Sequence, residues 1–315
     1  MYQKKVLWIG FHEEGEIAFK KLTELNVNIV GVITLTKDEL VKKSGAFDYR
    51  QFCEQSKIPI YEVTNINNDY AIGIIKNIMP EITFVIGWSQ ILEDYTLDAL
   101  GLTIGAHASY LPKNRGSAPV NWAIINGEEE SGNTLMVLAA DVDTGDILYQ
   151  EKYPISLYDS CKTIYQKVAS ANAKMILSTI NDFESNEMRK VKQNINDDTL
   201  LPRRKPADGV IDWNQTSLKV YNFIRALTYP YPGATTILND IKIIIWVASY
   251  NKDKPYDNSN NNGNVIGVVY SFIPELCGVV IQCGVGVVTC HKIEVFNTGE
   301  LLVGERMINL FIEKT

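Results

Sequence analysis

The sequence predicts an α/β domain built on a parallel sheet, followed by a small β-barrel domain. The first sign is the start of the chain, where the apolar run Lys5–Ile9 leads into the turn Gly10–Gly15. Ala18 and Leu22 then recur at helical spacing, and an apolar run follows at Asn28–Ile33. Strand, glycine turn, helix and strand in this order open a parallel α/β sheet.

The same alternation continues to residue 87. Ile58–Val63 predicts a third strand, the next segment predicts a helix ending near Ile78, and Glu81–Gly87 predicts a fourth strand. Strands separated by helices pair in parallel, because the crossover returns the chain in the same direction. We expect this domain to occupy residues 1–200.

The second sign is a series of short strand patterns that predicts the β-barrel in a second domain, residues 201–315. A helix around Val220, Ile224 and Leu227 precedes them. The segment Asn251–Gly263 is rich in asparagine and aspartate, and we expect a mobile loop there. The strand patterns are IKIIIWVAS, NVIGVVYSF, GVVIQC, GVVTCHKIEV and ELLVGE.

The remaining elements of the first domain follow from periodicity and composition. Pro119–Asn126 can open as a helix, since proline suits a first helical turn. Residues 159–181 carry Ile164 and Val168 at helical spacing and predict a long helix. Residues 184–200 are polar without a period and predict a linker. Two further strands are expected at Thr134–Ala139 and Ile147–Ile155.

Composition excludes several classes of protein. The chain has 315 residues, of which 46% are hydrophobic and 21% charged, as in ordinary globular proteins. Its formal net charge is −7 and its pI is about 5.2. Nucleic-acid affinity rests largely on neutralisation of phosphates by lysine and arginine, so a nucleic-acid partner is disfavoured.

Cysteines and apolar runs indicate a cytoplasmic protein. The five cysteines are an odd number without disulfide or zinc spacing, which predicts buried thiols in a reducing compartment. No metal site is expected. No run reaches the length of a membrane span, and the apolar residues before Gly10 are too few for a secretory signal.

The first glycine turn does not predict a dinucleotide site. Its sequence GFHEEG departs from GxGxxG, and Glu13 and Glu14 would repel a pyrophosphate at the helix start. We expect His12 in this turn to be a surface histidine.

The stretch Gly101–Gln150 carries the candidate chemistry. An apolar run ends at His107, after which come Ser109 and the turn Leu111-Pro112-Lys113. Later, Asp141, Asp143 and Asp146 fall within six residues, in a turn that no hydrophobic core would accept. The two segments place polar side chains at an edge of the sheet.

These motifs resemble the folate-dependent N-formyltransferase family. HASYLPKNRGSAPVNWAIINGE followed by AADVDTGDI is similar to that family's Ser-x-Leu-Pro-x-x-Arg-Gly and Asp-x-Gly-Asp at about this separation. The resemblance extends to LPRRKPADGVIDW and YPYPGATT, as in sugar-modifying members, and so covers most of the chain. It implies a Rossmann-like formyltransferase domain and an oligonucleotide-binding-like barrel.

One position departs from the family. The asparagine that the family carries two residues before its histidine is Gly105 here, in Ile104-Gly105-Ala106-His107. The resemblance assigns that asparagine a hydrogen bond to the formyl oxygen, which glycine cannot donate. Loss of one oxyanion donor costs on the order of 10² to 10³ in turnover. The chain is therefore slow, uses another donor, or is inactive.

The resemblance assigns catalysis to His107 and Asp143. An imidazole can take the proton that the attacking amine releases, and a carboxylate accepting a hydrogen bond from the ring would orient it. The alternative is a satisfied buried histidine and an aspartate that only closes a turn with Gly145.

The resemblance also implies a site for 10-formyltetrahydrofolate. Backbone groups of Ser89, Gln90 and Ile91, beyond the carboxyl end of the fourth strand, would contact the pterin ring, although Ile91 and Leu92 could simply pack a helix start. Lys113 and Arg115 are candidates for a nucleotide phosphate, or alternatively solvated loop charges. The other expected folate-site residues are Ser109, Tyr110, Leu111, Pro112, Asp141 and Val142.

We expect formyl transfer to the amine of a nucleotide-linked amino sugar, by a cytoplasmic enzyme that could form a homodimer. A methionyl-tRNA formyltransferase is the second hypothesis, but the basic insertion that the resemblance would place within residues 34–57 is absent. The segment mixes lysine and arginine with aspartate and glutamate. A third hypothesis is a binding or regulatory protein that kept the fold and lost turnover with the asparagine.

Overall fold

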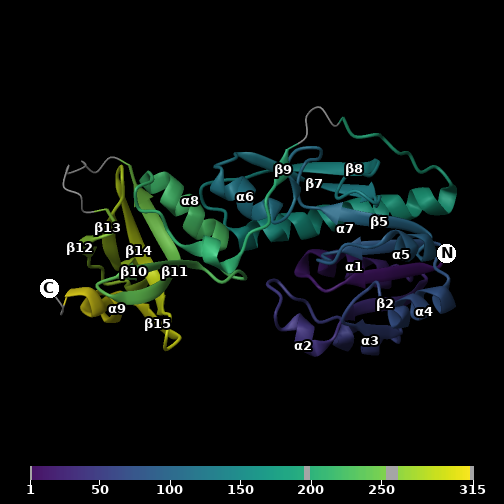
Figure 1. The fold of residues 1–315 in the computed structure, drawn as a ribbon, viewed down its shortest axis with the longest axis horizontal. Coiled ribbons are helices and arrows are strands. Elements are labelled where there is room, and N and C mark those ends of the chain that lie inside the picture. The colour runs from purple at the N-terminus through teal and green to yellow at the C-terminus, as the bar shows by residue number, and fades with distance from the viewer. Residues whose placement is uncertain (1, 195–198, 253–261, 313–315) are drawn as a thin grey trace. The chain divides into compact units, whose positions relative to one another are not determined.

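The computed structural model describes residues 2–194, 199–252 and 262–312 (Figure 1). The chain divides into two compact units. The first comprises Met1–Pro119, Glu130–Pro154 and Thr163–Pro202, and the second comprises Val120–Glu129, Ile155–Lys162 and Arg203–Thr315. The predicted domain boundary near residue 200 lies beside the last of these divisions, while two shorter segments of the first 200 residues belong to the second unit.

A mixed sheet forms the centre of the first unit. Among the described residues its strands lie in the order β3-β2-β1-β4-β5-β7-β8, and the first five are parallel (Figure 1). The predicted parallel sheet is therefore confirmed, and β7 and β8 extend it as antiparallel strands. The strands are β1 Val6–Gly10, β2 Ile29–Leu35, β3 Ile60–Val63, β4 Ile82–Ile86, β5 Leu102–His107, β7 Glu130–Val137 and β8 Ile147–Pro154.

Alternate residues of each strand point to opposite faces of the sheet, so two hydrophobic cores form. On one face, Trp8 and Phe84 pack with Phe19 of α1 (Glu16–Glu24) and Ile176 of α7 (Cys161–Ser185). On the other face, Leu7, Ile9 and Val85 pack with Ile75 of α4 (Asp69–Ile78). Helices on both faces explain why these strands are apolar throughout rather than alternating.

Shorter helices complete the first unit. The side chain of Asn68 caps α4, because its oxygen accepts a hydrogen bond of 2.8 Å from the Ala71 amide. The short helices are η1 Glu13–Gly15, α2 Lys37–Leu40, α3 Arg50–Ser56 and α5 Asp94–Ala99.

The segment predicted to be a linker, residues 184–200, is irregular at most of its described positions but belongs to the first unit and pairs with it at two places; residues 195–198 lie outside the described residues. After α7 ends at Ser185, Val191 forms a bridge with Ile147. Then β9 (Leu200–Leu201) pairs in parallel with β6 (Arg115–Gly116). Only single residues or pairs of residues of this segment take part in backbone pairing. A stretch this short shows no hydrophobic period, so the pairing left no sign in the sequence.

The second unit contains an antiparallel sheet and its own core. Among the described residues its strands lie in the order β10-β11-β14-β13-β12, with β15 paired to β14. Val220 and Ile224 of α8 (Ser217–Leu227) and Phe311 of α9 (Gly304–Ile312) pack into this core. The strands are β10 Ala234–Leu238, β11 Ile241–Asn251, β12 Val265–Val269, β13 Gly278–Gln282, β14 Val287–Val295 and β15 Glu300–Val303. Smaller elements of this unit are α6 Pro119–Ile125, η3 Pro206–Gly209 and η4 Pro274–Leu276.

The predicted β domain is confirmed, although α9 was not predicted. Its apolar residues Met307, Ile308 and Phe311 directly follow a strand pattern, which masks a helix of only two or three turns. In the loop predicted at Asn251–Gly263, residues 253–261 lie outside the described residues.

Two further sequence expectations concern the whole chain. Cys53, Cys161, Cys277, Cys283 and Cys290 are all buried, as predicted. In the part of the chain that the structure describes, every helix is too short or too polar to span a bilayer.

Candidate active site

His107 lies at the carboxyl end of β5, where open α/β sheets present their ligand-binding residues. The apolar residues before it, including Ile104, are buried in the sheet and fix the strand. The His107 side chain is only 8% exposed. Packing against buried neighbours therefore restricts the ring, in addition to its polar contacts.

Asp143 lies in the turn between β7 and β8. It adopts the left-handed conformation with φ of +56°, which a short polar side chain tolerates better than most. Gly145 allows the turn to close, because a β-carbon there would approach the Val137 carbonyl oxygen to 1.7 Å. The side chain of Asp143 is 16% exposed.

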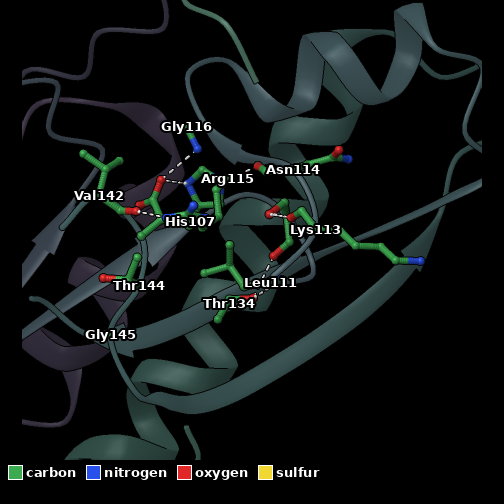
Figure 2. Close-up of polar contacts among 12 residues, drawn as sticks. His107, Leu111, Lys113, Asn114, Arg115, Gly116, Thr134, Val142, Thr144 and Gly145 are labelled. Atoms are coloured by element: carbon green, nitrogen blue, oxygen red, sulfur yellow. Dashed lines mark hydrogen bonds and ion pairs between the residues drawn. The ribbon is translucent and has the colours of Figure 1, made fainter. Parts of the chain in front are cut away.

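The structure brings the two predicted catalytic residues together. His107 Nδ1 lies 3.4 Å from Asp143 Oδ2, and His107 Nε2 lies 2.8 Å from the Asn114 carbonyl oxygen. His107 and Asn114 are labelled in Figure 2. Both partners are acceptors, so the ring can donate to both only when each nitrogen carries a proton.

The loop that follows His107 is tied to β7 by hydrogen bonds. Thr134 Oγ1 donates to the Ser109 carbonyl (2.7 Å) and accepts from the Leu111 amide (3.1 Å). Ser109 Oγ donates to the Lys113 carbonyl at 2.7 Å. The contact between Thr134 and Leu111 is visible in Figure 2. Ser109 and Leu111 are buried and therefore shape the loop rather than its surface.

Contacts to the Asp143 turn come from the same loop. The Gly116 amide donates to Asp143 Oδ2 at 3.0 Å, and Arg115 Nη1 donates to the Val142 carbonyl at 3.0 Å (Figure 2). A carboxylate with an amide donor is held in one orientation. Arg115, predicted as a phosphate ligand, thus contacts the turn, whereas Lys113 is exposed.

Gly105 lies on β5 with its Cα facing Leu138. An ideal β-carbon at Gly105 would approach Leu138 Cδ2 to 2.4 Å and Cγ to 3.0 Å. Leu138 therefore occupies the space that a side chain at this position would need. The position of Leu138 thus suits glycine at residue 105, where the sequence departs from the family pattern.

Ser89, Gln90 and Ile91 follow β4 at the same edge of the sheet as His107, since β4 and β5 are parallel neighbours. Gln90 is tied to the preceding strand–helix loop, because its amide donates to the Thr64 carbonyl (2.7 Å) and accepts from the Ile66 amide (2.9 Å). The Ile91 side chain is 67% exposed. Ser89 Oγ accepts from Lys43 Nζ at 3.3 Å.

The remaining predicted folate residues lie on loops of the first unit. Lys152 Nζ stacks over the partly exposed Tyr110 ring, 4.9 Å from its centre. Pro112 follows a cis peptide bond. Asp141 and Val142 are exposed, and the Asp141 carbonyl accepts from Thr144 Oγ1 at 3.0 Å.

His12 is buried, so the expected surface histidine is wrong. Its ring packs against Tyr165 with 4.8 Å between ring centres, and its Nδ1 accepts a hydrogen bond from the Glu14 amide. Burial lowers the pKa of His12 to about 4. Burial, reinforced by the charge of Glu13, raises the pKa of the Glu14 carboxyl to about 7, while the Gly87 amide opposes that rise.

His291 has a structural role, as expected. Its Nδ1 lies 3.0 Å from the Cys277 carbonyl and its Nε2 2.8 Å from Ser249 Oγ, both within the second unit.

Two residues near the site were missed in the sequence. Gln193 Nε2 donates to the carbonyls of Asp143 and Gly145, and Thr199 Oγ1 accepts from the Asn114 amide. Both lie in the stretch predicted as a linker and contact the backbone of the site. A residue that binds backbone groups far away in the chain leaves no local pattern.

Residues 13–180 match the formyl transferase family, and residues 203–301 match the formyl transferase C-terminal domain. The chain belongs to the formyl transferase family. The predicted family is therefore confirmed.

Two sequence relatives and one solved structure illustrate the range of this formyltransferase family. The bifunctional polymyxin resistance protein ArnA of Wigglesworthia glossinidia brevipalpis is 35% identical over 243 residues, 77% of this chain but only 37% of that protein. The methionyl-tRNA formyltransferase of Azobacteroides pseudotrichonymphae genomovar. CFP2 is 31% identical over 76% of each chain.

The solved structure is the Helicobacter canadensis N-formyltransferase in complex with folinic acid and dTDP-3-aminofucose. It is 20% identical, with a TM-score of 0.65, and the alignment covers 91% of this chain and 99% of that one. At this identity it supports the formyltransferase fold of both units.

Proposed function

We propose that this formyltransferase moves a formyl group from 10-formyltetrahydrofolate to the amine of a nucleotide-linked amino sugar. The observation that carries the proposal is the contact between His107 and Asp143 at the carboxyl edge of the sheet. A titratable ring oriented by a carboxylate is the arrangement that proton removal from an attacking amine needs.

The edge of the sheet has features that suit a folate. Trp88 Nε1 is a buried donor without a hydrogen-bond partner among the described residues, directly before Ser89. The exposed side chain of Ile91 and the partly exposed ring of Tyr110 offer apolar surface to a pterin. When bound, the folate supplies the formyl carbon, and the protein supplies the proton transfer and the orientation.

His107 would take the proton released by the amine when the Asn114 carbonyl no longer occupies Nε2. Asp143, fixed by the Gly116 amide, would balance the positive charge on the ring. The protonated ring could then return the proton to the departing nitrogen. Gly105 provides no side-chain donor for the oxyanion, so the rate would depend on the remaining donors.

The charge distribution supports a small acceptor rather than transfer RNA. The chain carries a net charge of −7. In residues 34–57, Arg50 contacts Glu62 (2.7 Å) and Asp48 (2.8 Å), and Lys42 contacts Glu39 (2.7 Å). Pairing with carboxylates lowers the net positive charge that this segment could offer to the phosphates of a nucleic acid.

The test is a transfer assay with 10-formyltetrahydrofolate and a panel of dTDP- and UDP-linked amino sugars. Mass spectrometry should detect one formylated product, and the reaction should release tetrahydrofolate in equal amount. The control is His107→Gln, which should reduce both signals by at least about a hundredfold. Absence of product from every amino sugar would refute the proposed acceptor.

Methionyl-tRNA is the second candidate acceptor, because the methionyl-tRNA formyltransferase relative aligns over 76% of both chains. The same assay with methionyl-tRNA distinguishes it. Formylation whose KM rises steeply with salt would favour this acceptor over an amino sugar.

A further inference from the structure

We infer that Gln193 and Thr199 are positioning residues for the His107–Asp143 pair, an inference that rests on the proposed formyl transfer at this pair. They come from the two described stretches that follow α7, Val191–Asn194 and Thr199–Leu201. We call these stretches the return segments. Gln193 contacts the backbone of the turn that carries Asp143, and Thr199 contacts the backbone of the loop that faces His107.

Gln193 holds the turn that carries Asp143. Its Nε2 donates to the Asp143 carbonyl at 2.9 Å and to the Gly145 carbonyl at 2.8 Å. Next to it, Val191 and Ile147 exchange two backbone hydrogen bonds of 2.7 and 2.9 Å. One amide group thus bridges two carbonyls of a turn whose Asp143 is in the left-handed conformation, which restricts the turn to one shape.

Thr199 holds the loop that carries the other partner of His107. Its Oγ1 accepts from the Asn114 amide at 2.7 Å, and its carbonyl accepts from the Arg115 amide at 2.9 Å. Pairing of β6 with β9 continues this contact to Gly116. The Asn114 carbonyl contacts His107 and the Gly116 amide contacts Asp143, so Thr199 sets both groups at once.

The contacts of both return segments therefore converge on a single ion pair. His107 Nδ1 and Asp143 Oδ2 lie 3.4 Å apart, at the long end of the range for a polar contact, so a small shift of the turn or the loop would separate the two side chains. Misplacement of a reacting group by about 1 Å can reduce turnover on the order of a hundredfold. Neither residue needs to touch the substrate to have this effect.

The experiment compares Gln193→Met and Thr199→Val, which remove the hydrogen bonds with little change of shape, in the full chain. Thr199→Ser keeps the hydroxyl, and Lys192→Met replaces the exposed neighbour of Gln193; both serve as matched controls. The chain has three histidines, so ¹⁵N-histidine labelling gives three ring spectra, and His107→Gln assigns one of them. This readout requires no acceptor.

We expect the His107 ring signals to shift or broaden in Gln193→Met and Thr199→Val, while those of His12 and His291 stay unchanged. Thr199→Ser and Lys192→Met should keep the original spectrum. With an accepted amino sugar, kcat should fall roughly ten- to a hundredfold in the first two variants, and the KM for 10-formyltetrahydrofolate should change less than about threefold.

A lower melting temperature with unchanged His107 signals would show that the return segments only stabilise the fold, and would overturn the inference. An unchanged kcat in both variants would overturn it as well. If no amino sugar is accepted, the ring spectra still decide the positioning role, so failure of the proposed acceptor stays distinguishable.

Discussion

His107 has both ring nitrogens engaged, and this determines how it can act. Nδ1 faces the Asp143 carboxylate, and Nε2 faces the Asn114 carbonyl. An amine that hands its proton to the ring must displace one of these acceptors. Asp143 is needed to orient the ring and is held by the Gly116 amide, so the Asn114 carbonyl is the acceptor that the amine has to displace, against the hold of Thr199 on its backbone.

We predict that His107→Gln lowers kcat for formyl transfer on the order of 10² to 10⁴, since general-base catalysis contributes about that much. The KM for the folate should change little. Steady-state kinetics measures both. His291→Gln, in the second unit, is the matched histidine control and should retain activity; equal losses in the two variants would contradict the assigned role.

Residue 105 gives a second prediction. Gly105→Asn alone forces Leu138 to move, and overpacking of this kind costs roughly 1 to 3 kcal/mol of stability. Gly105→Asn combined with Leu138→Ala frees the space, and we expect its kcat to exceed that of the original chain, by up to about 10². Leu138→Ala is the control. A double variant no faster than Leu138→Ala would mean that a side-chain donor at this position takes no part in turnover, and would favour a binding or regulatory protein.

The contact between His107 and Asp143 could be predicted from the sequence, but the contacts that support the two residues could not. His107 and Asp143 each stand in a local motif that a known family shares. Gln193 and Thr199 act on backbone carbonyls and amides more than 45 residues away, as their separations of 50 and 85 show. Contacts to backbone impose no requirement on the identity of the partner residue, so they leave no pattern to find.

At the scale of elements, the turn after β1 has an unusual distribution of charge. His12 favours its neutral form in the folded chain, with a pKa near 4 rather than 6.5. Glu14 favours its protonated form, with a pKa near 7 rather than 4.5. Stability from Glu14 is fully present below pH 4.5 and is lost as the pH rises through 7, whereas stability associated with neutral His12 is lost as the pH falls from 6.5 to 4.

We therefore predict that Glu14→Gln alters the pH dependence of stability. Relative to this variant, the original chain should lose on the order of 2 kcal/mol of unfolding free energy between pH 5 and 8. Urea unfolding at several pH values measures the difference. Glu24→Gln, at the exposed end of α1, provides the control, and parallel curves for Glu14→Gln and the original chain would contradict the prediction.

Elements with strong apolar patterns were predicted well, and short ones were not. The strands of the first sheet follow from buried apolar runs such as Val6–Gly10. The short strand β9 (Leu200–Leu201) and the helix α9 (Gly304–Ile312) were missed. A strand of two residues is too short to show a period. The apolar residues of the short helix α9 directly follow those of a strand, so the two patterns could not be separated.

At the scale of the whole molecule, each unit has a hydrophobic core of its own. Four of the five cysteines lie within these cores and Cys161 is buried as well, and burial raises the pKa of Cys53 and Cys283 to about 12. A cytoplasmic location and a homodimer remain predictions from the sequence.

We expect the thiols of the native chain to react slowly with a disulfide reagent such as DTNB, because a buried thiol is neither accessible nor ionised. All five should react rapidly in urea. Absorbance of the released thiolate measures both rates. Rapid labelling of one thiol in the native chain would contradict the prediction and identify an exposed cysteine.

The position of the return segments affects how this chain can be recombined with its relatives. The matching region of the formyl transferase family ends at residue 180, before Gln193 and Thr199. A chimera joined at that point would inherit His107 and Asp143 from one parent and their backbone clamps from another. Junctions placed after Leu201 would keep the whole assembly from a single parent.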